Sequence, residues 1–146
     1  MLKIYTIKLV IILLTTVVSA QNWQHNFEKA KEIAFQENKP IILVFSGSDW
    51  CGPCIKLDNQ IWKSDEFKNY ANNNYILVKA DFPRKKSNSL SKEQLTHNEN
   101  LAEKYNKKGY FPLVVVFNAD GKVLGETGYK NISPKEYIQH LQSFIK

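Results

Sequence analysis

Apolar and polar residues follow one another along this chain in a pattern typical of an α/β domain. Continuous apolar runs at residues 41–45 and 113–117 predict strands that are covered on both faces. Another strand is expected at residues 75–81, and the turn residues at 118–121 predict a β-hairpin. Apolar residues at helical spacing predict further helices, which lie at residues 26–38, 54–61, 64–71, 91–105 and 133–145.

Polar residues mark the ends of these predicted helices. Asn26 is placed to cap the first helix, and Pro40 prevents its continuation. Ser91 and Gln94 form the sequence pattern of a capping box at the fourth helix. Trp62 is expected to close the core beneath the second helix. Each helix therefore presents an apolar stripe to a sheet, and no internal repeat interrupts the order.

The first twenty residues carry a separate pattern. Lys3 and Lys8 come first, an apolar run follows from residue 9, and small residues stand before Gln21. This order predicts a secretory signal peptide at residues 1–20 that is cleaved near Ala20, so the protein is expected to be periplasmic or secreted. The alternative is an uncleaved membrane anchor, because the apolar stretch approaches the length that spans a bilayer. A lipoprotein is not expected, because no cysteine stands near the cleavage site.

Residues 21–146 are long enough for one domain with a single core. The whole chain has a formal net charge of +6, and removal of the first segment leaves a mild positive surplus. Basic runs occur at residues 84–86 and 107–108, but neither is interleaved with aromatic residues as in a nucleic-acid platform. We therefore expect no nucleic-acid partner. The loop around residues 84–86 is either simply solvated or a contact for a protein partner.

Cys51 and Cys54 are the chain's two cysteines, and they are separated by two residues. Such a pair closes a reversible disulfide across one helical turn, or supplies half of a zinc site. The zinc alternative lacks its other half, since the histidines at 25, 97 and 140 show no paired spacing. We expect neither a metal nor another cofactor.

The cysteines follow a predicted strand and a short loop, so Cys51 falls where a helix should begin. Unpaired backbone N–H groups and the helix dipole stabilise a thiolate at that position and lower the pKa of the Cys51 thiol. Cys54, one turn inside the helix, is expected to be buried and less ionised. Cys51 is thus predicted to be the exposed nucleophile, and Cys54 to resolve the mixed disulfide that forms.

The stretch Trp50-Cys51-Gly52-Pro53-Cys54 after a hydrophobic strand resembles the active site of the thioredoxin superfamily. The order of predicted elements is similar too, and the resemblance covers essentially all of residues 21–146. It implies a thioredoxin-like fold, a central mixed β-sheet flanked by helices on both faces. It also implies that Pro112 is preceded by a cis peptide bond and lies against the cysteines. The substrate-binding residues expected on this basis are Trp50, Gly52, Pro53, Phe111 and Pro112.

Two features depart from the family pattern. Two residues, Tyr110 and Phe111, separate Gly109 from Pro112 where the family usually has one, so the loop opposite the cysteines is altered. Phe45 stands six residues before Cys51, where thioredoxins proper bury an acid that is thought to accept the proton of the second cysteine. Lys79 matches the lysine of the neighbouring strand. Asp49 is either a substitute acid acting through water or a solvent-facing loop residue.

The resemblance implies an exported thiol-disulfide oxidoreductase that exchanges the Cys51–Cys54 disulfide with protein partners and favours their reduction. Its partners would be disulfide-containing or dithiol proteins and an upstream, membrane-borne electron donor, and the domain is expected to be a monomer. The alternative is a secreted or membrane-anchored binding or chaperone module without redox turnover. A disulfide that closes so short a loop stabilises a fold little, which argues against a merely structural role.

Overall fold

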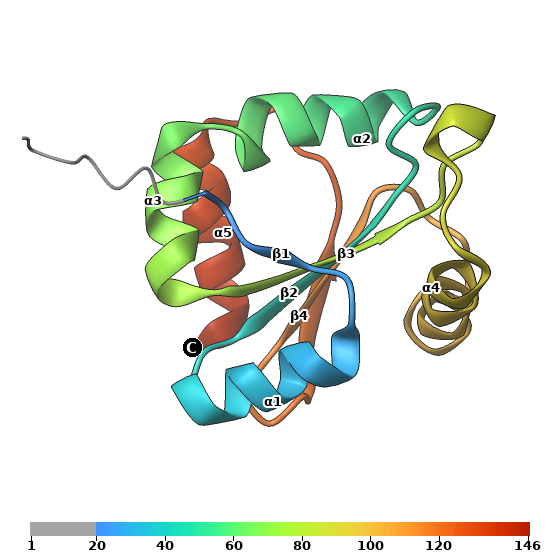
Figure 1. Ribbon diagram of the computed structural model, residues 1–146. Coiled ribbons are helices and arrows are strands. Elements are labelled where there is room, and N and C mark those ends of the chain that lie inside the picture. Colours follow the sequence, from blue (N-terminus) through green and yellow to red (C-terminus); the bar gives the residue numbers. More distant parts are fainter. Residues whose placement is uncertain (1–19) are drawn as a thin grey trace, which may run out of the picture.

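The apolar runs of the sequence form the centre of a five-stranded sheet in the computed structural model, which describes residues 20–146 (Figure 1). The strands stand in the order β1-β3-β2-β4-β5. Neighbouring strands β1, β3 and β2 run parallel, whereas β4 is antiparallel to β2 and β5 is antiparallel to β4. The bounds are β1 Trp23–Gln24, β2 Ile41–Ser46, β3 Ile76–Asp81, β4 Leu113–Phe117 and β5 Val123–Thr127.

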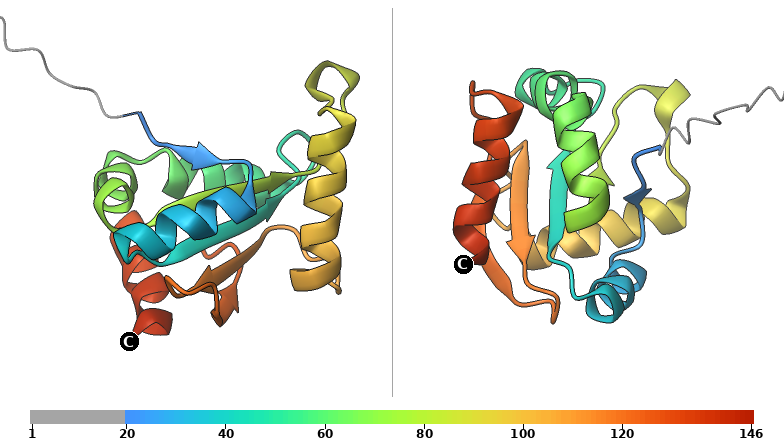
Figure 2. Two further views of the ribbon diagram at one scale, coloured as in Figure 1. Left: turned by 60° about the horizontal axis from the view of Figure 1, so that its bottom comes forward. Right: turned by 90° about the vertical axis from the view of Figure 1, so that its left-hand side faces the viewer.

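Five α-helices cover the two faces of this sheet in the described part of the chain. The helices are α1 Phe27–Glu37, α2 Gly52–Leu57, α3 Asp65–Asn74, α4 Lys92–Tyr105 and α5 Pro134–Ile145. Helices α2, α3 and α5 lie on one face, and α1 and α4 on the other (Figures 1 and 2). The thioredoxin-like fold with a mixed sheet flanked on both faces is therefore confirmed.

The strand pattern explains how each face is filled. Side chains alternate between the two faces, so Ile42 and Val44 of β2 pack beneath α2 and α5. Their neighbours Leu43 and Phe45 pack toward α1 and α4 instead. Trp62 is 2% exposed within the first of these clusters, as predicted. The Cys51–Cys54 pair therefore belongs to the Val44 face of the sheet.

Some element boundaries differ from the sequence prediction. The second helix ends at Leu57, and a π-helical turn follows at Asp58–Trp62. Ser91 caps α4 by accepting the N–H of Gln94, but the Gln94 amide donates to His25 and Asn98 and not to the cap. The capping-box prediction at this helix was thus half wrong.

The N-terminal segment expected to be a signal peptide lies outside the described residues, apart from Ala20. The short strand β1, which follows it, was not predicted from the sequence. Among the helices of residues 20–146, none combines the length and the apolar character that a membrane span requires.

Candidate active site

The two cysteines lie at the start of α2, after the loop that connects it to β2. Cys51 is the N-cap residue of α2, and its Sγ accepts the backbone N–H of Cys54 at 3.3 Å. The two residues form a disulfide, with Cα atoms 5.2 Å apart. Gly52 and Pro53 occupy the first turn of α2 and are exposed. The predicted strand, loop, motif and helix are therefore confirmed in that order.

The exposure of Cys51 differs from the prediction, whereas the predicted burial of Cys54 is confirmed. Cys51 is 5% exposed and Cys54 is 3% exposed, so both are buried. In this oxidised form the Cys51 sulfur is bonded to Cys54 and accepts the backbone N–H of Cys54. The two cysteines differ in helix position, since Cys51 caps α2 and Cys54 lies within it.

Aromatic side chains pack beside the motif. The Trp50 indole N–H donates to the carbonyl oxygen of Phe82 at 2.7 Å, and its ring meets Phe111 edge to face at 5.4 Å between centroids. Phe111 contacts Phe82 in the same manner. The peptide bond between Phe111 and Pro112 is cis, as the resemblance implied. The structure thus brings Trp50 and Phe111 together, and Pro112 lines a cavity with Cys54.

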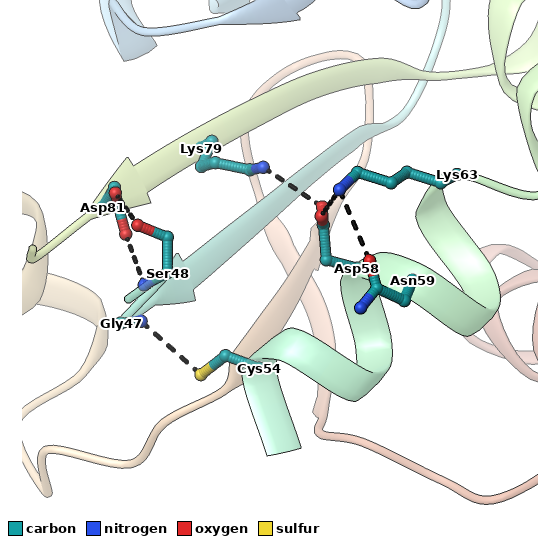
Figure 3. A network of polar contacts seen from close by, with 8 residues as sticks. All are labelled: Gly47, Ser48, Cys54, Asp58, Asn59, Lys63, Lys79 and Asp81. Atoms are coloured by element: carbon teal, nitrogen blue, oxygen red, sulfur yellow. Dashed lines mark hydrogen bonds and ion pairs between the residues drawn. The ribbon is translucent and has the colours of Figure 1, made fainter. Parts of the chain in front are cut away.

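That cavity lies beneath Cys54 and has a volume of about 140 Å³. Besides Cys54 and Pro112, its lining includes Asp58 from the π-helical turn and Lys79 from β3. The Lys79 ammonium is 3.5 Å from a carboxylate oxygen of Asp58, and Lys63 pairs with the other oxygen at 2.7 Å (Figure 3). A cavity of this size has room for several waters. Asp58 and Cys54 therefore line the same small cavity.

Phe45 does not take the place of the family's buried acid in space, although it has the right spacing in the sequence. Its side chain is fully buried on the opposite face of the sheet, among residues covered by α1 and α4. Val44 pairs with Lys79 across β2 and β3, and it is Val44 that lines the cavity beneath Cys54. A shift of one residue along a strand reverses the face to which a side chain points.

Asp49 is neither a free loop residue nor a substitute acid beneath the cysteines. Its carboxylate accepts the backbone N–H groups of Arg84 and Lys85, at 2.9 and 3.0 Å, and the side-chain amide of Asn88 at 3.0 Å. These bonds, that from Arg84 foremost, lower the pKa of Asp49 below its usual value. Asp49 therefore holds the basic loop against the residues just before Cys51.

Two candidate site residues were missed by sequence reasoning. Asp58 stands four residues after Cys54, so both lie on one face of a helix, and this spacing was the available signal. Asn106 is 5% exposed, and its side chain makes two hydrogen bonds to the backbone of Tyr110, which shape the loop leading to Pro112. No periodicity in the sequence distinguishes an asparagine with that role.

The sequence profile of a family described as thioredoxin-like matches residues 22–119. The chain belongs to this family, as the motif indicated. A protein of Chlamydia pneumoniae named disulfide bond reductase DsbH is 38% identical over 133 residues, which cover 90% of this chain and 78% of the relative. The thioredoxin-related protein DsbJ of the same organism is 27% identical over 88 residues, which cover 56% of this chain and 25% of DsbJ.

Solved structures are similar over most of the chain. One described as DsbH oxidoreductase has a TM-score of 0.79 and 36% identity, covering 87% of this chain and 85% of its own. A disulphide isomerase from Xylella fastidiosa Temecula1 has a TM-score of 0.61 at 22% identity, covers 87% of this chain and 100% of its own, and shows the fold alone. The family and the DsbH relatives support thiol-disulfide oxidoreductase chemistry for this protein.

Proposed function

We propose that this protein is an exported disulfide reductase that acts on protein disulfides through the Cys51–Cys54 couple. The main support for this proposal is the disulfide at the start of α2. Cys54, its second cysteine, lines a cavity together with Asp58. The 38% identical relative is itself named a disulfide bond reductase. Export is supported by the lysines, apolar run and small residues of the segment 1–20.

The reaction begins with the reduced dithiol. The Cys51 thiolate attacks one sulfur of the partner's disulfide, and the other partner sulfur leaves as a thiolate that takes up a proton. Cys54 then attacks the Cys51 sulfur of the mixed disulfide, which releases the partner's second thiol. The partner gains two electrons and two protons, and the enzyme is left with the Cys51–Cys54 disulfide. A separate dithiol donor must return the enzyme to its reduced form.

The second step requires that Cys54 lose its proton inside the protein. Asp58 supplies a carboxylate to the lining of the cavity that Cys54 also lines, and the volume of about 140 Å³ gives room for a water to relay the proton between them. Asp58 therefore acts as the proton acceptor that the family usually places on the strand. Lys79, which pairs with Asp58 at 3.5 Å, holds the carboxylate in place.

The dipeptide between the cysteines favours the reducing direction. Gly52 and Pro53 add no cation beside Cys51, so within the motif itself only the helix terminus stabilises the thiolate. A site of this kind keeps a thiol pKa of about 7 and a potential of roughly −270 mV, whereas a strong oxidant reaches about −120 mV. The partners are disulfide proteins outside the cytoplasm, and a membrane-borne dithiol supplies the electrons.

Insulin reduction and redox equilibration test this function together. The reduced protein should precipitate the insulin B chain and should equilibrate with a reference thioredoxin near −270 mV. A potential near −120 mV would overturn the reductase direction. Absence of any exchange would overturn the oxidoreductase function and favour a binding module. N-terminal sequencing of the protein recovered from cells tests cleavage near Ala20, and an intact Met1 would contradict it.

A further inference from the structure

The loop between β3 and α4 carries three cations, and it is fixed to the residues that precede the candidate nucleophile. Asp49 holds the backbone of Arg84 and Lys85, and the Trp50 indole holds the carbonyl of Phe82. Asp49 and Trp50 are the two residues immediately before Cys51 in the sequence. Figure 1 shows this loop beside the loop that leads into α2. The cations of the loop therefore keep a defined position relative to the sulfur.

The Arg84 side chain is itself placed. Its guanidinium carbon lies 3.8 Å from the centroid of the Trp50 ring, a stacking contact that restrains the long side chain. The contact leaves the N–H groups at the rim of the guanidinium plane available to an acceptor. Arg84, Lys85 and Lys86 are all exposed. We call these three side chains the cationic rim.

The side chains of the cationic rim are exposed, whereas the two neighbouring carboxylates, Asp49 and Asp81, are partly exposed and engaged in hydrogen bonds. Asp49 uses both oxygens on the loop. Asp81 uses both oxygens on Ser48, accepting its backbone N–H at 3.0 Å and its hydroxyl at 2.5 Å. None of the ion pairs found within residues 20–146 includes a side chain of the rim. A partner that docks at Cys51 therefore meets positive charge at this edge.

We propose that the cationic rim selects partner disulfides that are flanked by acidic side chains. The inference rests on the proposed function, since it names the class of substrate for the same site. An acidic segment next to the partner cysteine would pair with Arg84 and the lysines while its sulfur meets Cys51. Exposed charges of this kind act mainly on the rate of encounter and are screened by salt.

A pair of peptide disulfides tests the rim. The two are mixed disulfides with glutathione, identical except that glutamates flank the cysteine in one and lysines in the other. The reduced protein should reduce the acidic peptide roughly tenfold faster at about 20 mM salt, and the preference should fall to within about twofold at 0.5 M. The uncharged bis(2-hydroxyethyl) disulfide reports the intrinsic reactivity of Cys51.

Matched variants separate the effect of charge at the cationic rim from the effect of the protein's overall charge. The triple variant Arg84→Gln, Lys85→Gln, Lys86→Gln should lose the preference while its rate with the uncharged disulfide stays unchanged. The control Lys29→Gln, Lys122→Gln, Lys135→Gln removes the same charge from exposed positions on α1, the hairpin turn and α5, and should keep the preference.

The outcomes also separate this inference from the function on which it rests. Equal rates with the two peptides, or equal losses of preference in both triple variants, would overturn the role of the cationic rim alone. Failure to reduce any of the three disulfides would overturn the proposed function itself. A slower rate of the rim variant with the uncharged disulfide would mean that these residues act on Cys51 and not on the partner.

Discussion

Replacing Gly47 by alanine should destabilise the loop that carries the motif, although the residue itself has no side chain. A Cβ built on Gly47 would lie 2.3 Å from Cε2 and 2.7 Å from Nε1 of Trp50. Carbon atoms in contact normally stand about 3.5–4.0 Å apart, so the indole must move by more than about 1 Å. Such a movement breaks the 2.7 Å hydrogen bond from Trp50 to Phe82 and disturbs the stacking of Arg84.

The expected loss follows from these contacts. A hydrogen bond contributes about 1 kcal/mol, an exposed cation–π contact about 0.5–1 kcal/mol, and an aromatic pair about 0.5–1.5 kcal/mol. Alanine restricts the unfolded chain and returns about 0.4–1 kcal/mol. The free energy of unfolding of Gly47→Ala should therefore fall by about 1–3 kcal/mol relative to the parent protein.

Urea unfolding of the oxidised protein measures this change, and the indole N–H signal of Trp50 in an NMR spectrum reports the broken hydrogen bond. Gly52→Ala is the matched control, because a Cβ there has nothing within 4 Å and the residue begins a helix. That variant should keep the parent stability or gain up to about 1 kcal/mol. A Gly47→Ala protein as stable as the parent, with an unshifted Trp50 signal, would refute the reasoning.

Further predictions concern the cysteines, the cavity and pH. In the reduced protein near neutral pH, iodoacetamide should alkylate Cys51 before Cys54, because only Cys51 lies at the helix N-terminus; equal labelling by mass spectrometry would contradict the assigned roles. Asp58→Asn should slow release of the mixed disulfide roughly tenfold or more without slowing its formation, whereas the exposed control Asp120→Asn should change neither in stopped-flow assays; unchanged or faster release would exclude Asp58 as the proton acceptor. Burial lowers the pKa of His140, so the unfolded chain binds its proton first and urea stability should fall as the pH drops below about 6.5 toward the folded-state pKa. His140→Gln should flatten that slope, and an unchanged slope would mean that other groups cause it.

The sequence was sufficient for the sheet and the motif because both depend on local patterns. The apolar runs of β2 and β4 and the position of Cys51 before a helix are visible without tertiary contacts. The cis bond before Pro112 came from resemblance to a family, since propensity alone favours the trans form. The two residues of β1 are too few to form a pattern.

The chemistry beneath Cys54 was hidden because it depends on which residues meet across the fold. Asp58 and Lys79 are 21 residues apart, and only the folded chain brings their side chains together. The spacing of Phe45 from Cys51 matches that of the family's buried acid. Its side chain nevertheless packs on the face of the sheet opposite the cysteines, which the spacing does not reveal. Asp49 looked like an ordinary loop residue in the sequence. Its role depends on hydrogen bonds from residues 84–88, which are far from it along the chain.

The π-helical turn at Asp58–Trp62 is a place where the length of this chain can change. A π turn accommodates one more residue than an α turn, and here it is closed by the N–H of Lys63 and the carbonyl of Asp58 at 2.9 Å. Because the π turn absorbs that extra residue, deleting one of residues 59 and 60 would let it close as an α turn and leave the residues on either side close to their places. Trp62 would stay in the core, where it is 2% exposed, and Asp58 would stay in the lining of the cavity. A homologue that is one residue shorter within this turn should therefore keep both the fold and the cavity.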